Sequence, residues 1–314
     1  MGAENITSVT DFILMGLSNN RETQILLFVV FLFMYSATIV GNLLIIILVR
    51  VDSCLHTPMY FFLTHLSGVE ICFVTTTVPQ MLTHLMSGNG AISFTRCAAQ
   101  MYATTCLGCT ECLLLSAMAY DRCLAICSPL VYAAIMSKKH QWQLTSASWA
   151  IGFFLASINV TCTISLPFCG TNHINHFFCE QPVVFKKTCV EARYTEPVIF
   201  VGCTLILVGS FSIILVSYGL ILYSVFQMQS KRGRHKAFST CASHLVVVVM
   251  FYGVLFFLYM RTGVETALDS DKHIAVFYLV VTPMLNPFIY SLRNKDVHRA
   301  VTKVLRRLDF EEKT

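Results

Sequence analysis

The chain has 314 residues, of which 55% are hydrophobic and only 12% are charged. Soluble domains usually carry about 25% charged residues, so this composition excludes an ordinary soluble protein, and it also excludes a disordered chain, collagen and a coiled coil. The net charge of +5 comes from short basic clusters between long apolar blocks, which indicates a membrane surface and argues against nucleic acid as a partner.

Seven apolar stretches are long enough to cross a membrane as helices, because about 20 residues span the hydrocarbon core. We therefore expect an all-α membrane protein, a seven-transmembrane helix bundle over residues 25–292, preceded by a tail of residues 1–24. The first span is expected to act as its own insertion signal, because no basic segment of a cleavable signal peptide precedes it. The seven stretches are Ile25–Val49, Pro58–Met86, Ala98–Cys127, Trp142–Phe168, Pro197–Gln227, Ala237–Met260 and His273–Leu292.

Lysine and arginine are distributed unequally over the connections between these spans. Fifteen of the 22 fall on one side, which the positive-inside rule assigns to the cytoplasm. With seven spans, the N-terminus is then extracellular and the C-terminus cytoplasmic. In agreement, Asn5 begins a glycosylation sequon in the N-terminal tail, whereas a second sequon at Asn159 lies inside the fourth span and is interpreted as chance.

The longest connection, Cys169–Glu196, is rich in cysteine. It contains Cys169, Cys179 and Cys189, and Cys97 begins the third span on the same extracellular face. An even set of four oxidisable cysteines predicts disulfides that staple this loop. Four cysteines allow three pairings, and their spacing leaves all three open.

The segment after the last span alternates apolar and basic residues at helical spacing. This pattern predicts an amphipathic helix within residues 293–314 that lies on the anionic inner leaflet, so membrane lipids are expected partners. Its apolar positions are Val297, Val301, Val304, Leu305 and Leu308, and its basic positions are Lys295, Arg299, Lys303, Arg306 and Arg307.

Polar residues at membrane depth are the strongest candidates for function, because burying them in lipid is costly. Asn42, Glu70, Glu111 and Asn286 come from four different spans, all near mid-membrane. The two carboxylates can share a proton or a sodium ion. A neutral carboxyl group that hydrogen-bonds within the bundle explains them equally well, and the sequence leaves both interpretations open.

The third and seventh spans carry further polar signals. Arg122 at the cytoplasmic end of the third span can simply extend to the interface, or it can pair with Asp121 as a latch that opens toward a partner. Position alone favours neither reading. In the seventh span Pro283 and Pro287 predict a kink, and Asn286 between them is expected to hydrogen-bond the freed carbonyl groups.

Small residues line the outer half of the third span. Such residues usually allow close helix packing, but they can equally leave room for a small ligand. They are Thr104, Thr105, Gly108, Cys109 and Cys112.

Several long runs, in order along the chain, resemble the odorant receptors of the rhodopsin-like, class A G-protein-coupled receptors, in their tetrapod branch. The runs are Gly41-Asn42, LHTPMYFFL at Leu55–Leu63, MAYDRCLAICSPLVY at Met118–Tyr132, Ser217-Tyr218, KAFSTCASHL at Lys236–Leu245 and PMLNPFIYSLRN at Pro283–Asn294. The resemblance covers almost the whole chain. One departure is Cys123, where the family usually has Tyr after Asp-Arg.

The resemblance implies a plasma-membrane receptor without enzymatic activity. Its expected partners are a small odorant and a heterotrimeric G protein of the stimulatory, olfactory type, which raises cAMP. It implies disulfides between Cys97 and Cys179 and between Cys169 and Cys189. It also favours a sodium or proton site at Glu70 and Glu111, with no other cofactor. The residues implied in activation and G-protein coupling are Asp121, Arg122, Tyr218, His244, Asn286, Pro287 and Tyr290.

By the same resemblance, the ligand pocket lies between the third, fifth, sixth and seventh spans, under the long loop. Its side chains are mostly small or apolar with hydroxyl and thiol groups, which favours a small, largely apolar ligand. A charged amine is disfavoured because Thr104 stands where amine receptors carry Asp, and retinal because Val280 stands at the opsin lysine position. The expected contacts are Met101, Thr104, Thr105, Gly108, Cys109, Cys112, Cys203, Ile206, Tyr252, Leu255, Tyr259 and Val276.

Three other functions compete with this interpretation. A channel or proton-coupled transporter would use Glu70 and Glu111, but the sequence has no repeat of the kind that builds many transporters. A membrane enzyme is disfavoured because no nucleophile–base pair or metal cluster stands out in the sequence. A non-olfactory receptor for another small ligand is the nearest alternative.

Overall fold

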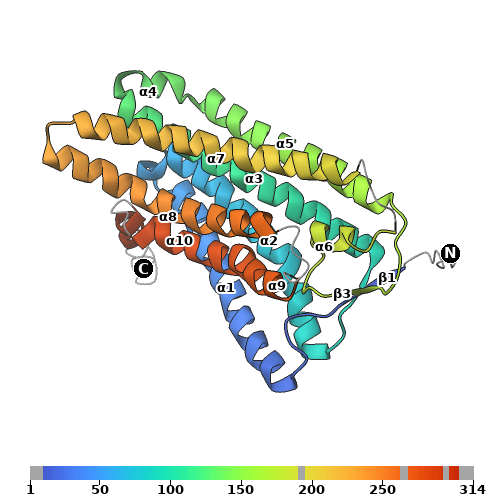
Figure 1. The fold of residues 1–314 in the computed structure, drawn as a ribbon. Helices are drawn as coiled ribbons and strands as arrows, with labels where there is room; N and C mark the ends of the chain where they lie inside the picture. The colour runs from blue at the N-terminus through green and yellow to red at the C-terminus, as the bar shows by residue number, and fades with distance from the viewer. Residues whose placement is uncertain (1–9, 190–194, 262–267, 293–296, 304–314) are drawn as a thin grey trace, which may run out of the picture.

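The computed structural model of the chain describes residues 10–189, 195–261, 268–292 and 297–303 (Figure 1). Its α-helices are α1 (Arg21–Val51), α2 (Pro58–Ser87), α3 (Phe94–Cys127), α4 (Pro129–Ile135), α5 (Lys138–Ile164), α6 (Gln181–Phe185), α7 (Thr195–Gln227), α8 (Lys231–Arg261), α9 (Leu268–Val276) and α10 (Thr282–Leu292). A 3₁₀ turn, η1 (Ser53–Leu55), follows α1, and a π-helical segment, η3 (Phe277–Val281), joins α9 to α10. The strands are β1 (Asp11–Leu14), β2 (Ala91–Ser93) and β3 (His173–Ile174).

Within the described residues, seven helical segments are long and apolar enough to cross a membrane, which confirms the predicted seven-helix bundle. They are α1, α2, α3, α5, α7, α8 and the continuous unit α9–η3–α10. The fourth helix begins and ends a few residues earlier than the approximate limits Trp142–Phe168 expected for this span, because α5 is Lys138–Ile164. It begins early because the Ser137 side chain caps it by accepting the His140 N–H. It ends early because Pro167 disfavours the helical conformation in the residue before it.

Helix α3 runs through the middle of the bundle and packs against α2, α5, α7 and α8 (Figure 1). Its residues Leu114, Leu115 and Met118 are completely buried. The α5 backbone approaches α3 so closely that a Cβ at Gly152 would lie 2.5 Å from Thr110 Oγ1. Glycine is therefore required at this contact. By contrast, large apolar side chains on α1 and α7 are widely exposed, as expected for faces that contact lipid.

A small three-stranded sheet closes one end of the bundle, which we call the disulfide end because both disulfides lie there. Strand β1 is its centre, antiparallel to β2 and parallel to β3. Phe12 and Leu14 of β1 are buried against Phe168 and Ile174 of the long loop. The chain passes so close to β1 that a Cβ at Gly90 would lie 2.0 Å from the Leu14 carbonyl oxygen. The sequence predicted only an N-terminal tail here, so the three-stranded sheet is a feature that the sequence analysis did not predict.

The seventh span shows how the bundle tolerates proline. Pro287 has no N–H, so the Pro283 carbonyl one turn earlier loses its helical partner. The Asn42 side chain of α1 replaces it, donating from Nδ2 to the Pro283 oxygen at 3.2 Å and to the Thr38 oxygen at 3.0 Å. The prediction that Asn286 would satisfy the freed carbonyl is wrong, because its Nδ2 donates to Glu70. The π-helical segment η3 ends at Val281, two residues before Pro283, whose missing N–H interrupts the helical hydrogen-bond pattern.

Residues 297–303 form a helix at the opposite end, which we call the Arg122 end. Val297 and Ala300 are buried against the bundle, and Lys303 Nζ lies 3.5 Å from Asp52 Oδ1. The Cys54 backbone N–H donates to Asp52 Oδ1 at 3.1 Å. This hydrogen bond, with a smaller effect from Lys303, lowers the pKa of Asp52. Residues 297–303 of the predicted amphipathic segment are thus helical, while Lys295, Val304, Leu305, Arg306, Arg307 and Leu308 lie outside the described residues.

Candidate functional site

Four polar side chains meet in the interior of the bundle, as the sequence placed them. Asn286 of α10 donates from Nδ2 to Glu70 Oε1 of α2, and Asn42 of α1 bonds the α10 backbone. Glu111 of α3 is 1% exposed, and its charge would repel that of Glu70. Each of these residues comes from a different helix, so the cluster joins α1, α2, α3 and α10.

The atoms of this cluster that lack a hydrogen-bond partner among the described residues are all acceptors. They are Asn42 Oδ1, Asn286 Oδ1 and both carboxylate oxygens of Glu111. Buried acceptors are costly unless a proton or a cation reaches them, and oxygen atoms of this kind are what sodium-like hard cations prefer. Within the described part of the chain no group of three His, Cys, Asp or Glu side chains is arranged to hold a metal. A cation would therefore depend on the amide oxygens as well as the carboxylates.

At the Arg122 end, the Asp121 carboxylate contacts the connecting helix α4. Tyr132 of α4 donates its hydroxyl to Asp121 Oδ1 at 2.8 Å. Among the described residues, Asp121 makes no ion pair with Arg122 within 4.0 Å, and Arg122 Nε is buried without a hydrogen-bond partner. Neighbouring residues on a helix point in different directions, which explains why the two do not meet directly. Tyr132 was not predicted as a site residue, although it ends the Met118–Tyr132 run.

A second hydrogen-bonded unit ties three helices together near Arg122. His244 Nε2 of α8 lies 3.1 Å from the Leu115 carbonyl oxygen of α3, and His244 Nδ1 lies 2.7 Å from the Tyr218 hydroxyl of α7. A carbonyl only accepts, so Nε2 carries the proton, and in the neutral ring Nδ1 accepts from Tyr218. Both side chains are buried. The structure thus brings together two residues that the resemblance implied in activation.

Tyr252 of α8, one of the expected pocket residues, forms hydrogen bonds to α3 and α7. Its hydroxyl lies 3.1 Å from the Cys112 carbonyl oxygen of α3 and 2.7 Å from Ser210 Oγ of α7. Its ring lies 5.3 Å from that of Phe211 and 6.2 Å from that of Phe256, measured between centroids. Ser210 was not predicted, because nothing in the α7 sequence distinguishes it from the other serines there.

The remaining expected pocket residues have varied surroundings. A Cβ at Gly108 would meet nothing within 4 Å, so open space borders α3 at this height. Asn159 Nδ2 of α5 donates to Cys203 Sγ at 3.2 Å, so the Cys203 sulfur already accepts a hydrogen bond within the protein. Met101 is buried in the cluster beneath the loop with Val160 and Val184. The side chain of Tyr259 lies outside the described residues. Cys109 is buried, and Thr104, Thr105, Ile206, Leu255 and Val276 are partly exposed.

Both disulfides implied by the resemblance are present. Cys97 of α3 pairs with Cys179, and Cys169 pairs with Cys189 within the long loop. Gln100 of α3 secures the same loop: its Oε1 accepts the Cys179 N–H at 2.8 Å, and its Nε2 donates to the Thr76 oxygen at 3.0 Å. The loop is thus fixed over the bundle by covalent and hydrogen bonds.

The loop also contacts the seventh span through Glu180. Tyr278 of η3 donates its hydroxyl to Glu180 Oε1 at 2.7 Å, and His176 Nε2 lies 3.4 Å from Glu180 Oε2. The His176 ring is 1% exposed and packs against Phe177 and Phe178. Burial, supported by the positive charge of Lys272, lowers the pKa of His176 to about 3. The histidine is therefore neutral at physiological pH.

This buried histidine predicts a loss of stability in acid. A freely exposed histidine has a pKa of about 6.5. Below that pH, His176 binds a proton in the unfolded chain but stays neutral in the folded chain. The stability due to neutral His176 is then lost progressively between about pH 6.5 and 3, or about 2 kcal/mol by pH 5. The thermal stability of purified receptor should fall less from pH 7 to pH 5 in His176→Phe than in wild type.

The exposed His173 of the same loop provides the matched control. His173→Phe should keep the wild-type dependence on pH. An equal slope in wild type and His176→Phe would show that this histidine is not the group responsible.

The comparisons with known proteins agree over nearly the whole chain. A sequence model described as olfactory receptor matches residues 31–307. The chain belongs to the olfactory receptor family. The human olfactory receptor 5F1 is 46% identical over 307 residues, 98% of each chain, and the human olfactory receptor 2D2 is 48% identical over 303 residues, 96% of this chain and 98% of the relative. The squid rhodopsin crystal structure is similar in fold, with a TM-score of 0.74 at 16% identity over 90% of this chain and 81% of that one.

Membership of the olfactory receptor family confirms the predicted class of protein. This family consists of G-protein-coupled receptors, which are multi-pass proteins of the plasma membrane and are not enzymes. The channel, transporter and enzyme alternatives are thereby set aside.

Proposed function

We propose that this olfactory receptor binds a small, largely apolar volatile molecule among α3, α7, α8 and α9, and then activates a stimulatory, olfactory-type G protein that raises cAMP. The observation that carries the proposal is the link from Tyr218 through His244 to Leu115, which holds α7, α8 and α3 together near Arg122. Such a link defines a closed state, and a ligand that favours its opening shifts the equilibrium toward the active state.

In this proposal the same residues have defined roles in opening. Movement of α8 away from α3 breaks the bond between His244 and Leu115. Tyr218 and Tyr290 rearrange with it, and Arg122 becomes available to the C-terminal helix of the G protein. The Tyr132 hydroxyl holds Asp121 in the closed state.

The chemistry of the expected pocket supports an apolar ligand. Thr104 already donates its hydroxyl to the Gln100 and Met101 carbonyl oxygens of its own helix, at 2.9 and 3.1 Å. Position 104 is a threonine and therefore offers no carboxylate to bind an amine. The space beside Gly108 is suited to a small molecule. The ligand then gains most of its affinity from apolar contact.

The experiment is a cAMP assay in cells that express the receptor with an olfactory-type G protein, across a panel of volatile compounds. At least one compound should raise cAMP above that in cells without receptor. Cells with an inhibitory-type G protein serve as the comparison. Signalling only through that second G protein, with the receptor present at the surface, would contradict the proposed coupling.

We further propose that the disulfide end is extracellular, so that the N-terminus lies outside and the C-terminus inside. The distribution of Lys and Arg and the oxidised cysteines support this orientation. Asn5, which lies outside the described residues, is then a glycosylation site. Its glycan should be removed by a glycosidase added to intact cells, whereas a protected glycan would contradict the orientation.

We also propose that the acidic cluster binds a sodium ion. Glu70 and Glu111 would supply charge, and Asn42 and Asn286 would supply amide oxygens. The four unpartnered acceptor atoms support this assignment, because a cation satisfies several of them at once. A bound ion would favour the closed bundle, since it joins α1, α2, α3 and α10.

The sodium proposal predicts that Glu111→Gln removes a salt-specific stabilisation. Purified wild-type receptor should unfold at a higher temperature in sodium than in choline chloride of equal ionic strength, because sodium binds only the folded bundle. In Glu111→Gln, which keeps the shape but not the charge, the difference should disappear. Equal unfolding temperatures of wild type in the two salts would instead indicate a shared proton.

A further inference from the structure

Two cysteines meet in the last turn of α3, at the Arg122 end. Cys123 Sγ lies 3.9 Å from Cys127 Sγ, because residues four apart share one face of a helix. Cys123 is also the position at which this chain departs from the olfactory receptor pattern, which usually has Tyr there. Both thiols are free in the structure, and the proposed function uses neither of them.

The surroundings place Cys127 to react before Cys123. Its sulfur accepts hydrogen bonds from the Ser224 hydroxyl of α7, at 3.2 Å, and from the Cys123 thiol. These two bonds hold the Cys127 sulfur beside that of Cys123. Cys127 is partly exposed, whereas Cys123 is only 8% exposed. A reagent therefore reaches Cys127 first and finds a second thiol in contact with it.

A disulfide between the two cysteines requires a local change of the helix. Residues four apart on an α-helix have Cα atoms about 6 Å apart, within the range of about 4.4–6.8 Å across disulfides. Their Cβ atoms are about 5–6 Å apart, however, whereas a disulfide needs about 3.5–4.5 Å. Cys127 is the last residue of α3, and helix ends fray. The last turn can therefore tighten or unwind to let the bond form.

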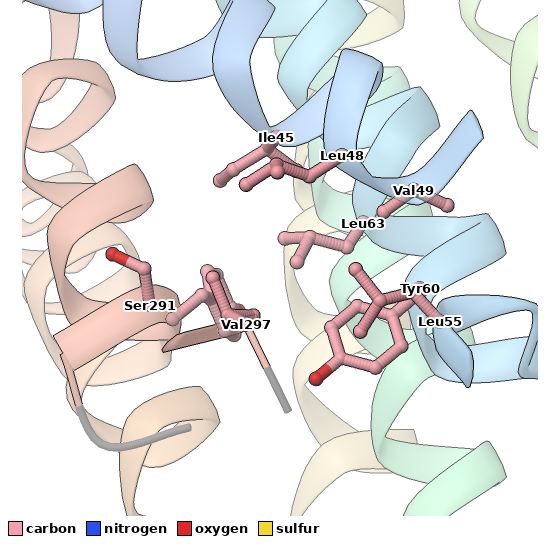
Figure 2. A pocket seen from close by; sticks show the side chains of 9 residues that line it. Ile45, Leu48, Val49, Leu55, Tyr60, Leu63, Ser291 and Val297 are labelled. Carbon is pink, nitrogen blue, oxygen red and sulfur yellow. The ribbon is translucent and has the colours of Figure 1, made fainter. Parts of the chain in front are cut away.

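Dense packing at the Arg122 end favours a small oxidant. Figure 2 shows Ser291 and Val297 facing Leu63 and Tyr60 at this end, across a space with room for about one water molecule. Because Cys127 is only partly exposed, a bulky oxidant such as glutathione disulfide is disfavoured. Hydrogen peroxide, which is little larger than water, suits the site best.

We propose that Cys123 and Cys127 form a reversible oxidation site for hydrogen peroxide, and that the disulfide form favours the active receptor. The Cys127 sulfur attacks one peroxide oxygen: an S–O bond forms, the O–O bond breaks, and one water leaves, which gives a sulfenic acid. The Cys123 sulfur then attacks Cys127, an S–S bond replaces the S–O bond, and a second water leaves. In sum, two thiols are oxidised to one disulfide while one peroxide is reduced to two waters.

The same geometry makes the disulfide easy to reduce. A disulfide that holds its Cβ atoms closer than the helix prefers is strained, and strained disulfides have the more oxidising potentials that are typical of regulatory bonds. At the proposed cytoplasmic side, two glutathione molecules then restore both thiols and leave as one glutathione disulfide. The site thus responds to the balance between peroxide and thiol.

The effect on signalling rests on the proposed function, in which the Tyr132 hydroxyl holds Asp121 in the closed state. Helix α4 begins at Pro129, two residues after Cys127, so a change in the last turn of α3 moves Tyr132 relative to Asp121. Oxidation also alters the sulfur that accepts the Ser224 hydrogen bond between α3 and α7. Two contacts of the closed bundle are weakened together, which shifts the equilibrium toward the active state.

The test uses purified full-length receptor in lipid nanodiscs, treated with hydrogen peroxide that catalase then removes. Trypsin cleaves after Arg122 and Lys138, so one peptide, residues 123–138, contains both cysteines and no other cysteine. After alkylation of free thiols, this peptide should remain unalkylated and be lighter by two hydrogen atoms. Reduced glutathione, added before alkylation, should reverse the change. The Ser128 N–H, which donates to the Leu124 oxygen at 3.0 Å, should exchange its hydrogen at least about tenfold faster in oxidised receptor.

Three variants separate the cysteine pair from other thiols. Cys123→Tyr restores the residue usual in the family and should fold, but Cys127 then lacks its second thiol. Cys127→Ser removes the first thiol. Cys54→Ser is the matched control, because Cys54 is a free, exposed cysteine at the same end of the bundle. Peroxide should raise ligand-free nucleotide exchange on the G protein severalfold in wild type and Cys54→Ser, and should not change it in the other two variants.

Each outcome decides one part of the proposal. A peptide 123–138 that stays fully alkylated after peroxide, or a disulfide from Cys127 to Cys241 instead, would overturn the oxidation site. A disulfide that leaves nucleotide exchange unchanged or lowers it would overturn the activating role. A receptor that catalyses no exchange in any variant contradicts the proposed function. The peptide masses and the Ser128 exchange rate, which need no G protein, still decide whether the oxidation site exists.

Discussion

Replacing Arg122 with alanine is expected to abolish ligand-driven cAMP while leaving the amount of receptor at the cell surface unchanged. The Arg122 Nε atom is buried without a hydrogen-bond partner among the described residues, so its loss removes no closed-state hydrogen bond of that atom. The proposed active state needs the guanidinium to meet the G protein. The response at matched surface level should therefore fall by at least about tenfold, within the usual range of coupling free energies.

The matched control for this variant is Arg50→Ala. Arg50 is exposed at the end of α1 and carries the same charge toward the same end of the bundle. If the loss of positive charge alone weakened G-protein binding, both variants would lose signal equally. Normal cAMP from Arg122→Ala, with surface level confirmed by antibody labelling of intact cells, would refute the proposed role.

The membrane-spanning helices could be predicted from the sequence because hydropathy determines which segments enter a membrane. Long apolar stretches with few charges locate the spans, and local signals such as the Ser137 cap adjust their ends. The long runs of family residues were sufficient for the class of receptor. These inferences need no knowledge of which helix faces which.

The contacts of single polar residues could not be predicted in this way. Asn42 rather than Asn286 bonds the Pro283 carbonyl, and this depends on how α1 packs against α10. A Cβ at Gly41 would lie 3.1 Å from Pro287 Cβ, which shows how close that packing is. Tyr132 contacts Asp121 only because α4 packs against α3. Such pairings are properties of the tertiary structure.

The three-stranded sheet at the disulfide end could not be predicted for a related reason. Strand β1 has four residues, and it pairs with segments about 80 and 160 residues away in the chain. Its alternation of exposed and buried residues is too short to distinguish a strand from an ordered tail. Only the long loop, stapled by its disulfides, provides the surface on which Phe12 and Leu14 can be buried.

Cys97→Ser is expected to remove most receptor from the cell surface. The disulfide between Cys97 and Cys179 joins residues 82 apart, and closing a loop of that length stabilises the folded chain by about 4 kcal/mol in the chain-entropy model. That is a large share of the roughly 5–15 kcal/mol by which proteins are stable. Surface staining should therefore fall severalfold, and the remaining receptor should unfold at a lower temperature.

A matched pair of variants separates the bond from the thiol. Cys72→Ser changes a free, exposed cysteine and should leave surface staining unchanged. The double variant Cys97→Ser with Cys179→Ser should resemble the single variant, because both lack the same disulfide. The two differ only in that the single variant leaves the Cys179 thiol unpaired. Recovery in the double variant would mean that the free Cys179 thiol, rather than the missing staple, causes the defect. Full surface level and full response in Cys97→Ser would show that the loop holds its place without the disulfide, through Gln100 and the β1 sheet alone.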